Sequence, residues 1–317
     1  MNKYTTWEWW CSRRPPSCDI IEQMKSASVV LALSVLAIAA QAGVVFQDTF
    51  AVPGSQLDLS KWITEIGPTS FLGRTQLADW VTPGPGGVFV VGASGAELAL
   101  NTHNPSGDSL FGTHAKTLTA FQPTASSTIA LTTRMQLTSL HPGIVFATYF
   151  YGCSPGTCAA SHDEIDIELV TNMLQPGTLQ VQLNRYANEP LGAGNGVVVD
   201  LPPGFDPLAV HDWTIRWSLT SIEFLVDGTL LYSTTTHVPQ GPMHANVIAW
   251  GPGPEWPAAY SASLQSVASA NLNQRFVASL TSVTVTDSSV PEPGTSAMML
   301  FGVVALLLRH ARRTRIG

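Results

Sequence analysis

The 317-residue chain carries 15 Lys and Arg against 22 Asp and Glu, a formal net charge of −7 at pH 7. Between residues 43 and 290 the imbalance is larger, with seven basic against 18 acidic side chains and a formal charge of −11. A surface this acidic argues against nucleic acid and anionic membranes as partners, and roughly 250 residues suit a single all-β domain.

The first 42 residues have the features of an export signal. Met24 and Lys25 precede an apolar run, residues 29–40, and a small-residue cleavage site that ends at Ala42. The run is too short for a stable membrane span. We therefore interpret residues 24–42 as a secretory signal peptide, and residues 1–23 as sequence upstream of the true start at Met24.

Short β-prone runs separated by Gly and Pro follow the signal. None of them shows a sustained helical periodicity, and breaks about every eight to twelve residues are typical of a β-sandwich or barrel. The predicted strands are residues 45–50, 88–91, 97–100, 110–121, 127–137 and 143–151. This half of the chain therefore predicts an all-β fold.

The next segment, residues 163–170, alternates acidic and aliphatic side chains without interruption. In a strand, a period of two places Glu164, Asp166 and Glu168 on one face and the aliphatic side chains on the other. Two carboxylates about 5.5 Å apart, at an effective dielectric near 20, repel by about 3 kcal/mol. One of the three acids should therefore hold a proton near neutral pH.

Two carboxyl groups in different protonation states can break a glycosidic bond, one as nucleophile and the other as proton donor and later base. Glu side chains at i and i+4 of a strand, with Cα atoms about 13 to 14 Å apart, could lean together to about 5 to 6 Å, the retaining separation. Two alternatives stay open: a strand face with solvated acids, and oxygen ligands for a hard cation.

Cys153 and Cys158 are the only cysteines between residues 43 and 290. In an exported protein they are expected to form a disulfide, which would close a small loop just before the acidic strand. Two buried free thiols are the alternative.

Alternating runs continue after the acids, at residues 179–186, 211–217, 221–232, 242–250 and 274–286. Asp227-Gly228, between two apolar halves, predicts a type I′ hairpin and makes Asp227 a turn residue. Trp250 and Trp256, flanked by Gly and Pro, are the predicted stacking surfaces for sugar rings, because an aromatic face buries apolar area with few directional constraints.

The C-terminus combines a proline-rich stop at Pro291 and Pro293, an apolar run over residues 297–308, and a basic cluster that includes Arg309. This arrangement resembles the PEP-CTERM sorting tail, which is recognised by an exosortase in Gram-negative bacteria. An ordinary anchoring helix is the alternative, but the run is shorter than the ~20 residues that a bilayer requires. Residues 290–317 are therefore expected to be a sorting tail.

Residues 162–168, His-Asp-Glu-Ile-Asp-Ile-Glu, resemble the signature of glycoside hydrolase family 16, which includes laminarinases, lichenases, agarases and carrageenases. The leading His-Asp pair is most similar to the xyloglucan endotransglycosylase branch. The resemblance implies that Glu164 is the nucleophile, Glu168 the acid/base and Asp166 the group that tunes the nucleophile. It also implies a concanavalin-like jelly-roll β-sandwich of two antiparallel sheets over residues 43–289.

The resemblance extends beyond this strand. Residues 57–62 match the start of the family's domain, where Trp62 would pack, and Asn184 falls where the family often places a polar residue facing the substrate. Residues 143–150 depart from the family, since they lack both Trp of a Gly-x-Trp-Pro-Ala-x-Trp motif. Tyr149 and Phe150 are the candidates to replace a Trp as a sugar contact; one of the two is expected to pack in the core, and Tyr149 is the predicted contact.

Together these features predict a secreted or cell-surface retaining endo-glycosidase of a Gram-negative bacterium, which acts as a monomer on a β-linked polysaccharide such as a β-glucan. A transglycosylase on the same scaffold and a non-catalytic glycan-binding module are the alternatives. The partners expected are the polysaccharide and the exosortase-type sorting machinery. No cofactor and no catalytic metal are expected, and a structural calcium stays open.

Overall fold

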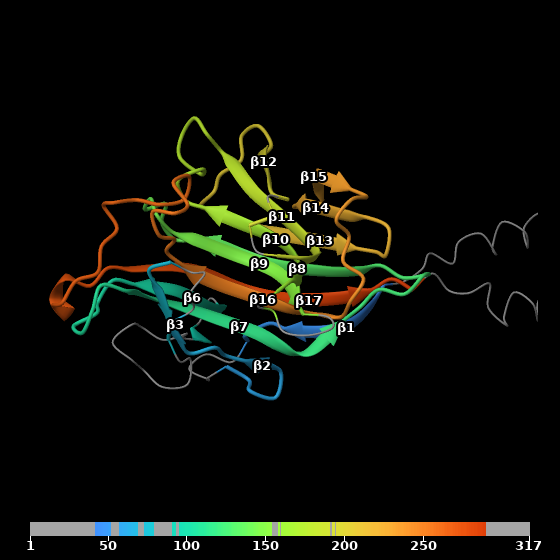
Figure 1. The fold of residues 1–317 in the computed structure, drawn as a ribbon, viewed down its shortest axis with the longest axis horizontal. Coiled ribbons are helices and arrows are strands. Elements are labelled where there is room, and N and C mark those ends of the chain that lie inside the picture. The colour runs from blue at the N-terminus through green and yellow to red at the C-terminus, as the bar shows by residue number, and fades with distance from the viewer. Residues whose placement is uncertain are drawn as a thin grey trace, which may run out of the picture. The chain divides into compact units, whose positions relative to one another are not determined.

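The computed structural model describes residues 42–289, apart from 52–56, 69–72, 79–90, 93–94, 154–157, 159, 191 and 194. These residues belong to one compact unit and form two β-sheets packed face to face (Figure 1). The predicted signal peptide, except Ala42, and the predicted tail lie outside the described residues. Within the described part, the one helical element is a 3₁₀ turn, η2 (Ala270–Leu272), and no helix is long and apolar enough to cross a membrane.

The first sheet, called here the groove sheet, has the strand order β12-β11-β10-β9-β16-β7-β2. Its strands are β2 (Trp62–Ile63), β7 (Leu110–Phe121), β9 (Val145–Gly152), β10 (His162–Val170), β11 (Gln180–Glu189), β12 (Val197–Asp200) and β16 (Met243–Trp250). Every pairing in this sheet is antiparallel. The acidic strand β10 therefore lies inside the sheet, bonded on both sides.

The second sheet, called here the back sheet, has the order β15-β14-β13-β8-β17, and β6 and β1 share the other edge of β17. Its strands are β1 (Gly43–Asp48), β3 (Gly67–Pro68), β4 (Thr75–Leu77), β5 (Val91–Gly92), β6 (Gly95–Asn101), β8 (Ile129–Leu137), β13 (Val210–Trp217), β14 (Ile222–Val226), β15 (Thr229–Thr234) and β17 (Arg275–Asp287). The predicted two-sheet sandwich is confirmed.

One pairing differs from the predicted antiparallel sheets. β4 runs parallel to the first three residues of β7, Leu110 to Gly112. The chain between them, residues 78–109, is long enough for the crossover that a parallel pair requires. From Thr113 onward β7 pairs with β16 instead, so this strand passes from the back sheet to the groove sheet.

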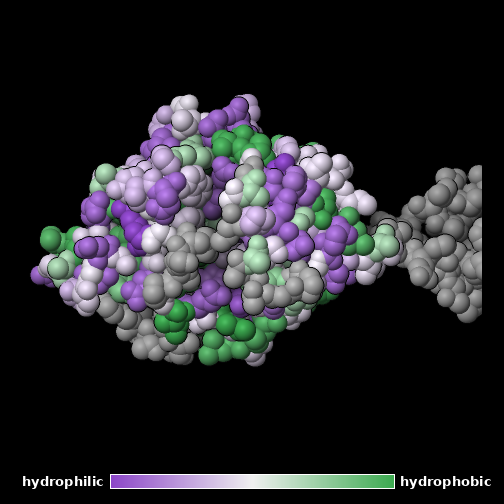
Figure 2. Space-filling view, viewed as in Figure 1, coloured by the Kyte–Doolittle hydropathy of each residue, from purple (hydrophilic) through white to green (hydrophobic). Residues whose placement is uncertain are grey.

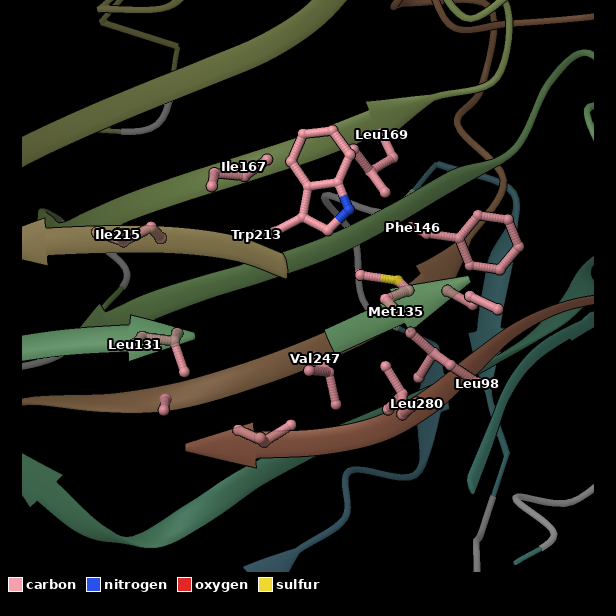
Figure 3. Packing of buried hydrophobic residues seen from close by; sticks show 14 of the residues in the cluster. Leu98, Leu131, Met135, Phe146, Ile167, Leu169, Trp213, Ile215, Val247 and Leu280 are labelled. Atoms are coloured by element: carbon pink, nitrogen blue, oxygen red, sulfur yellow. The ribbon is translucent and has the colours of Figure 1, made fainter. Parts of the chain in front are cut away.

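The alternation in β10 sorts its side chains as the sequence predicts. Ile165, Ile167 and Leu169 are at most 1% exposed and belong to the main hydrophobic core between the sheets. Figure 3 shows Ile167 and Leu169 facing side chains of the back sheet, among them Met135 and Trp213. Because one face of β10 is anchored in this core, the acids on its other face are held outward over the groove sheet.

Local predictions agree with the structure at two places and miss one short strand. Asp227 and Gly228 both have positive φ angles, 49° and 77°, as the predicted hairpin between β14 and β15 requires. Trp62 is 1% exposed and its indole Nε1 donates to Asp48 at 2.8 Å, so it packs as expected. The short strand β12 was not predicted, since it follows a loop rich in glycine and is only four residues long.

Candidate active site

The three acids of β10 form one row across the middle of the groove sheet. Cross-strand partners on β9 and β11 flank them: Tyr151 and Tyr186 beside Glu164, Tyr149 and Asn184 beside Asp166, and Ala147 and Gln182 beside Glu168. Asp166 is 4% exposed and Glu168 8%. Acids this buried are not a solvated strand face, so that alternative is wrong.

A groove passes over the acid row. Two cavities of about 400 Å³ and 610 Å³ share Glu164, Asp166, Glu168 and Trp250 in their walls. One lies over β9, β16 and β7, and the other over β11 and the loops beside it. In Figure 2 hydrophilic residues border a hollow near the centre of the face in view. The acids therefore lie where two halves of a groove meet, which suits a chain-like ligand that extends in both directions.

Asn184 connects two of the acids. Its backbone N–H donates to Asp166 Oδ1 at 2.9 Å, and its side-chain Nδ2 donates to Glu168 Oε2 at 2.8 Å. Gln182 Nε2 donates to Asn184 Oδ1 at 2.6 Å, which fixes the orientation of the amide. Asn184 was predicted to face the substrate; it does line the groove, but its amide is engaged by Glu168 and Gln182.

Gly196 makes room for this pair of amides. A Cβ atom at this position would lie 2.3 Å from Asn184 Oδ1 and 2.4 Å from Gln182 Nε2. A side chain at position 196 would therefore require the Asn184 and Gln182 amides to shift. Neither Gln182 nor Gly196 was predicted from the sequence, because the part each plays depends on how the Asn184 side chain is oriented.

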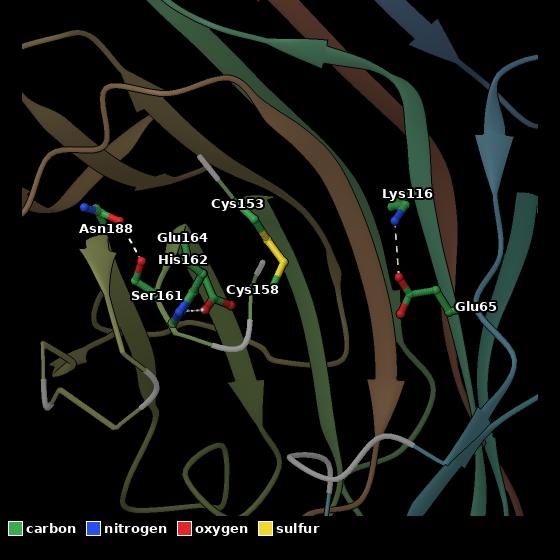
Figure 4. Close-up of a disulfide and its surroundings, with 8 residues drawn as sticks. All are labelled: Glu65, Lys116, Cys153, Cys158, Ser161, His162, Glu164 and Asn188. Carbon is green, nitrogen blue, oxygen red and sulfur yellow. Dashed lines mark hydrogen bonds and ion pairs between the residues drawn. A yellow bond between two sulfur atoms is a disulfide. The ribbon is translucent and has the colours of Figure 1, made fainter. Parts of the chain in front are cut away.

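His162 contacts Glu164, the first acid of the row. Its Nε2 lies 2.9 Å from Glu164 Oε2, and the two side chains are 0% and 15% exposed (Figure 4). Burial lowers the pKa of the His162 ring below its ordinary value. The sequence pointed to this histidine only as part of a family signature, and its contact with Glu164 comes from the structure.

Burial raises the pKa of every acid in the row. For Glu164, burial and then the charge of Glu168 raise the pKa to about 8. Burial and then the charge of Glu164 raise the pKa of Asp166, while burial and then Asp166 raise the pKa of Glu168, each well above the ordinary range. The row therefore titrates as a unit and retains protons at neutral pH.

The predicted aromatic contacts all line the groove. Tyr149 and Trp250 belong to the wall of the smaller cavity, and Trp250 and Trp256 to that of the larger one. The two indoles stack on each other, with ring centroids 5.7 Å apart and 30° between planes, and Trp250 is only 7% exposed. Phe150, next to Tyr149, is fully buried in the core.

A polar cluster from distant segments lines part of the smaller cavity, and it was not predicted from the sequence. Lys116 Nζ lies 3.3 Å from Glu65 Oε1, and His114 Nε2 lies 3.1 Å from Asn246 Oδ1. Figure 4 shows Lys116 and Glu65 turned toward each other. No spacing in the sequence could reveal this cluster, because its members come from three separate segments.

The two cysteines also reach the groove. A disulfide joins Cys153 and Cys158, whose Cα atoms are 5.2 Å apart, and both residues line the smaller cavity (Figure 4). In the part of the chain that the structure describes, no group of three or more His, Cys, Asp or Glu side chains is placed to hold a metal ion.

Comparison with known proteins gives two family matches. Residues 125–268 match the glycosyl hydrolases family 16, and residues 289–313 match the PEP-CTERM protein-sorting motif. A beta-glucanase of Bacillus subtilis strain 168 is 39% identical over 124 residues, which are 38% of this chain and 46% of that protein. The chain thus spans about half the length of the curated relatives that it matches.

Solved structures extend the likeness in fold. A prokaryotic beta-1,3-1,4-glucanase (lichenase) from a mouse hindgut metagenome superposes with a TM-score of 0.58 at 21% identity, over 77% of this chain and 99% of that one. The beta-glucanase of Bacillus licheniformis superposes with a TM-score of 0.54 at 22% identity, over 78% and 99% of the two chains. The predicted jelly-roll fold is confirmed.

Proposed function

We propose that this chain, whose residues 125–268 match the glycosyl hydrolases family 16, hydrolyses O-glycosidic bonds inside a β-linked glucan. The observation that carries the proposal is the row Glu164, Asp166 and Glu168 at the junction of two groove halves. A polysaccharide can lie along both halves while one of its bonds crosses the acids. The likeness to beta-glucanases supports a glucan as the substrate.

In the proposed reaction Glu168 is the acid and Glu164 the nucleophile. Glu168 donates its proton to the glycosidic oxygen as Glu164 attacks the anomeric carbon, which breaks the bond to the leaving sugar and forms a covalent glycosyl-enzyme. Glu168, now ionised, takes a proton from water, and the resulting attack releases Glu164. Two displacements restore the original anomeric configuration.

The electrostatics support these roles. The raised pKa of Glu168 keeps a proton available for the leaving group at neutral pH. Asn184 Nδ2, which donates to Glu168, will bind the ionised form more strongly after that proton has left. Asp166 lies between the two glutamates and, with a raised pKa, can donate a hydrogen bond to Glu164.

The sorting motif at residues 289–313 supports export and attachment at the surface of a Gram-negative bacterium. The predicted signal peptide at residues 24–42 agrees with that route. An exported glucanase would meet its polysaccharide outside the cell. Mass spectrometry of the exported protein should find its N-terminus at Gly43.

The direct test is to incubate the purified protein with mixed-linkage β-glucan, laminarin, xyloglucan and agarose. Product size should show internal cleavage of a β-glucan, and proton NMR of the first products should show retention. Products longer than the substrate would instead identify a transglycosylase. Binding without new reducing ends would identify a glycan-binding module.

Glu164→Gln and Glu168→Gln test the assigned residues. Each should lower kcat by at least about 10³-fold, because each removes a group that takes part in bond breaking. Glu223→Gln, on the exposed side of β14 in the back sheet, is the matched control and should keep the parental rate. Parental activity in either groove variant would refute the assignment.

A further inference from the structure

The surroundings of Glu164 oppose the ionised form that a nucleophile needs. The proposed nucleophile attacks as a carboxylate, yet burial and the charge of Glu168 raise its pKa to about 8. A protonated carboxyl group is a poor nucleophile. Some group in contact with Glu164 must therefore favour its ionised form.

The contact that can do so is His162. Its Nε2 lies 2.9 Å from Glu164 Oε2, within hydrogen-bond distance. The ring lies between two tyrosines, with centroids 5.3 Å from Tyr151 at 26° and 4.7 Å from Tyr186 at 36°. An imidazole packed on both faces keeps one orientation, so Nε2 stays directed at the carboxylate.

We propose that His162 is a positioning residue, which holds the Glu164 side chain in place and in its ionised form. The inference rests on the proposed function, in which Glu164 is the nucleophile. If Nε2 carries a hydrogen, it donates to Oε2 and stabilises the anion. A bare Nε2 would not hold the Glu164 proton, because burial lowers the pKa of the ring, so the role requires the tautomer with hydrogen on Nε2.

The other groups around the pair do not take over this role. The titratable neighbours are Asp163, Asp166 and Glu168 on β10, Tyr149 and Tyr151 on β9, Tyr186 and Glu189 on β11, and His244 on β16 beside Tyr151. The pKa values of Tyr151 and Tyr186 are raised to about 12, so both phenols stay neutral. When ionised, the acids among these neighbours disfavour the negative charge of Glu164, and the hydrogen bond that protonated Asp166 can donate adds to the contact from His162 rather than replacing it.

Two substitutions separate the hydrogen bond from the packing. His162→Phe keeps an aromatic ring between the tyrosines but removes Nε2, whereas His162→Gln keeps an N–H donor and loses the stacking. We expect His162→Phe to lower kcat about 10- to 100-fold with KM within about twofold, and to move the acid limb of kcat/KM up by about one to two pH units. His162→Gln should recover most of kcat and the parental acid limb.

An acid limb in His162→Phe that coincides with the parental one would overturn the proposal. Equal losses in both variants would also overturn it, because packing alone would then explain them. Thermal unfolding of each variant checks that it is folded before the kinetics are compared.

A second measurement does not depend on activity. Nitrogen-15 NMR can follow the titration of the His162 imidazole, assigned by its absence in His162→Phe. In Glu164→Gln the pKa of this ring should fall by about one unit or more, since its anionic partner is gone. An unchanged pKa would refute the coupling. If the protein cleaves no glucan, the proposed function fails, while this titration still decides whether the pair is coupled.

Discussion

Each glutamate at an end of the acid row has one neighbouring side chain within hydrogen-bond distance, and this contact affects its protonation. His162 contacts Glu164 at one end, and Asn184 contacts Glu168 at the other. Each bond favours the ionised form of its acid against the effect of burial. The two ends of the row therefore have different hydrogen-bond partners, as a nucleophile and a proton donor require, although the row titrates as a unit.

Asn184→Ala should lower kcat/KM about 10- to 100-fold and move its alkaline limb to higher pH. The substitution removes a donor to Glu168, so the carboxyl group loses its orientation and holds its proton more strongly. A pH profile of kcat/KM measures both effects. Gln180→Ala, at the start of the same strand with an exposed amide paired to Asp200, is the control and should keep the parental profile.

The raised pKa of Glu168 also predicts how stability changes with pH. A carboxyl group whose pKa is higher in the folded than in the unfolded protein stabilises the fold at pH values below its ordinary pKa, and this contribution is lost as pH rises through the raised value. Glu168→Gln should therefore lose less stability than the parent when the pH is raised from about 5 to about 9. Urea unfolding across this range measures it. Parallel curves for variant and parent would contradict the prediction.

Strands and turns in this chain follow local sequence patterns closely. β10 separates aliphatic from acidic side chains because its period of two meets a core on one side and a groove on the other. The β14–β15 hairpin forms at Asp-Gly because both residues need positive φ. Asp227 also accepts a hydrogen bond from the backbone of Asp212, which ties the hairpin to β13.

Gly228→Ala tests the hairpin. Gly228 has a φ of +77°, which an alanine adopts only with strain, so the free energy of unfolding should fall by about 1 kcal/mol. Gly107→Ala is the matched control, because a Cβ there meets nothing closer than 3.6 Å and no positive φ is required. Thermal unfolding compares the two. An equal effect in both variants would show that the turn conformation is not the cause.

Over the whole molecule, charge is distributed so that the groove stays acidic. Lys116 is the one Lys or Arg among the described residues that line the two groove cavities, and Glu65 lies 3.3 Å from it. The segments between residues 43 and 289 that the structure does not describe contain no Lys or Arg in their sequence. An uncharged polysaccharide therefore meets no electrostatic penalty in the groove, whereas an anionic one does.

A carboxymethylated β-glucan should therefore be cleaved more slowly than the neutral parent at low ionic strength. Raising the salt from about 20 mM to about 500 mM should reduce the difference, because screening shortens the range of the repulsion. The ratio of the two initial rates measures the effect, with the neutral glucan as its own control. A ratio that does not change with salt would contradict the electrostatic explanation.

The sequence by itself determined the strands, the face on which the acids lie, and the turn at Asp227, because these depend on side-chain period and on local backbone preferences. It also marked Trp250 and Trp256, since aromatic residues among glycines and prolines are visible without a fold, and Tyr149, where the segment lacks the Trp residues of the family motif. Only the tertiary structure decided that His162 contacts Glu164, that Gln182 orients Asn184, and that Glu65 pairs with Lys116 in the wall of the smaller cavity. The first two contacts join side chains two residues apart on one strand, and the side chains packed around them set their orientation. The third joins separate segments, which meet only through strand register and sheet packing, and register is fixed only when the hydrophobic faces of both sheets are buried together.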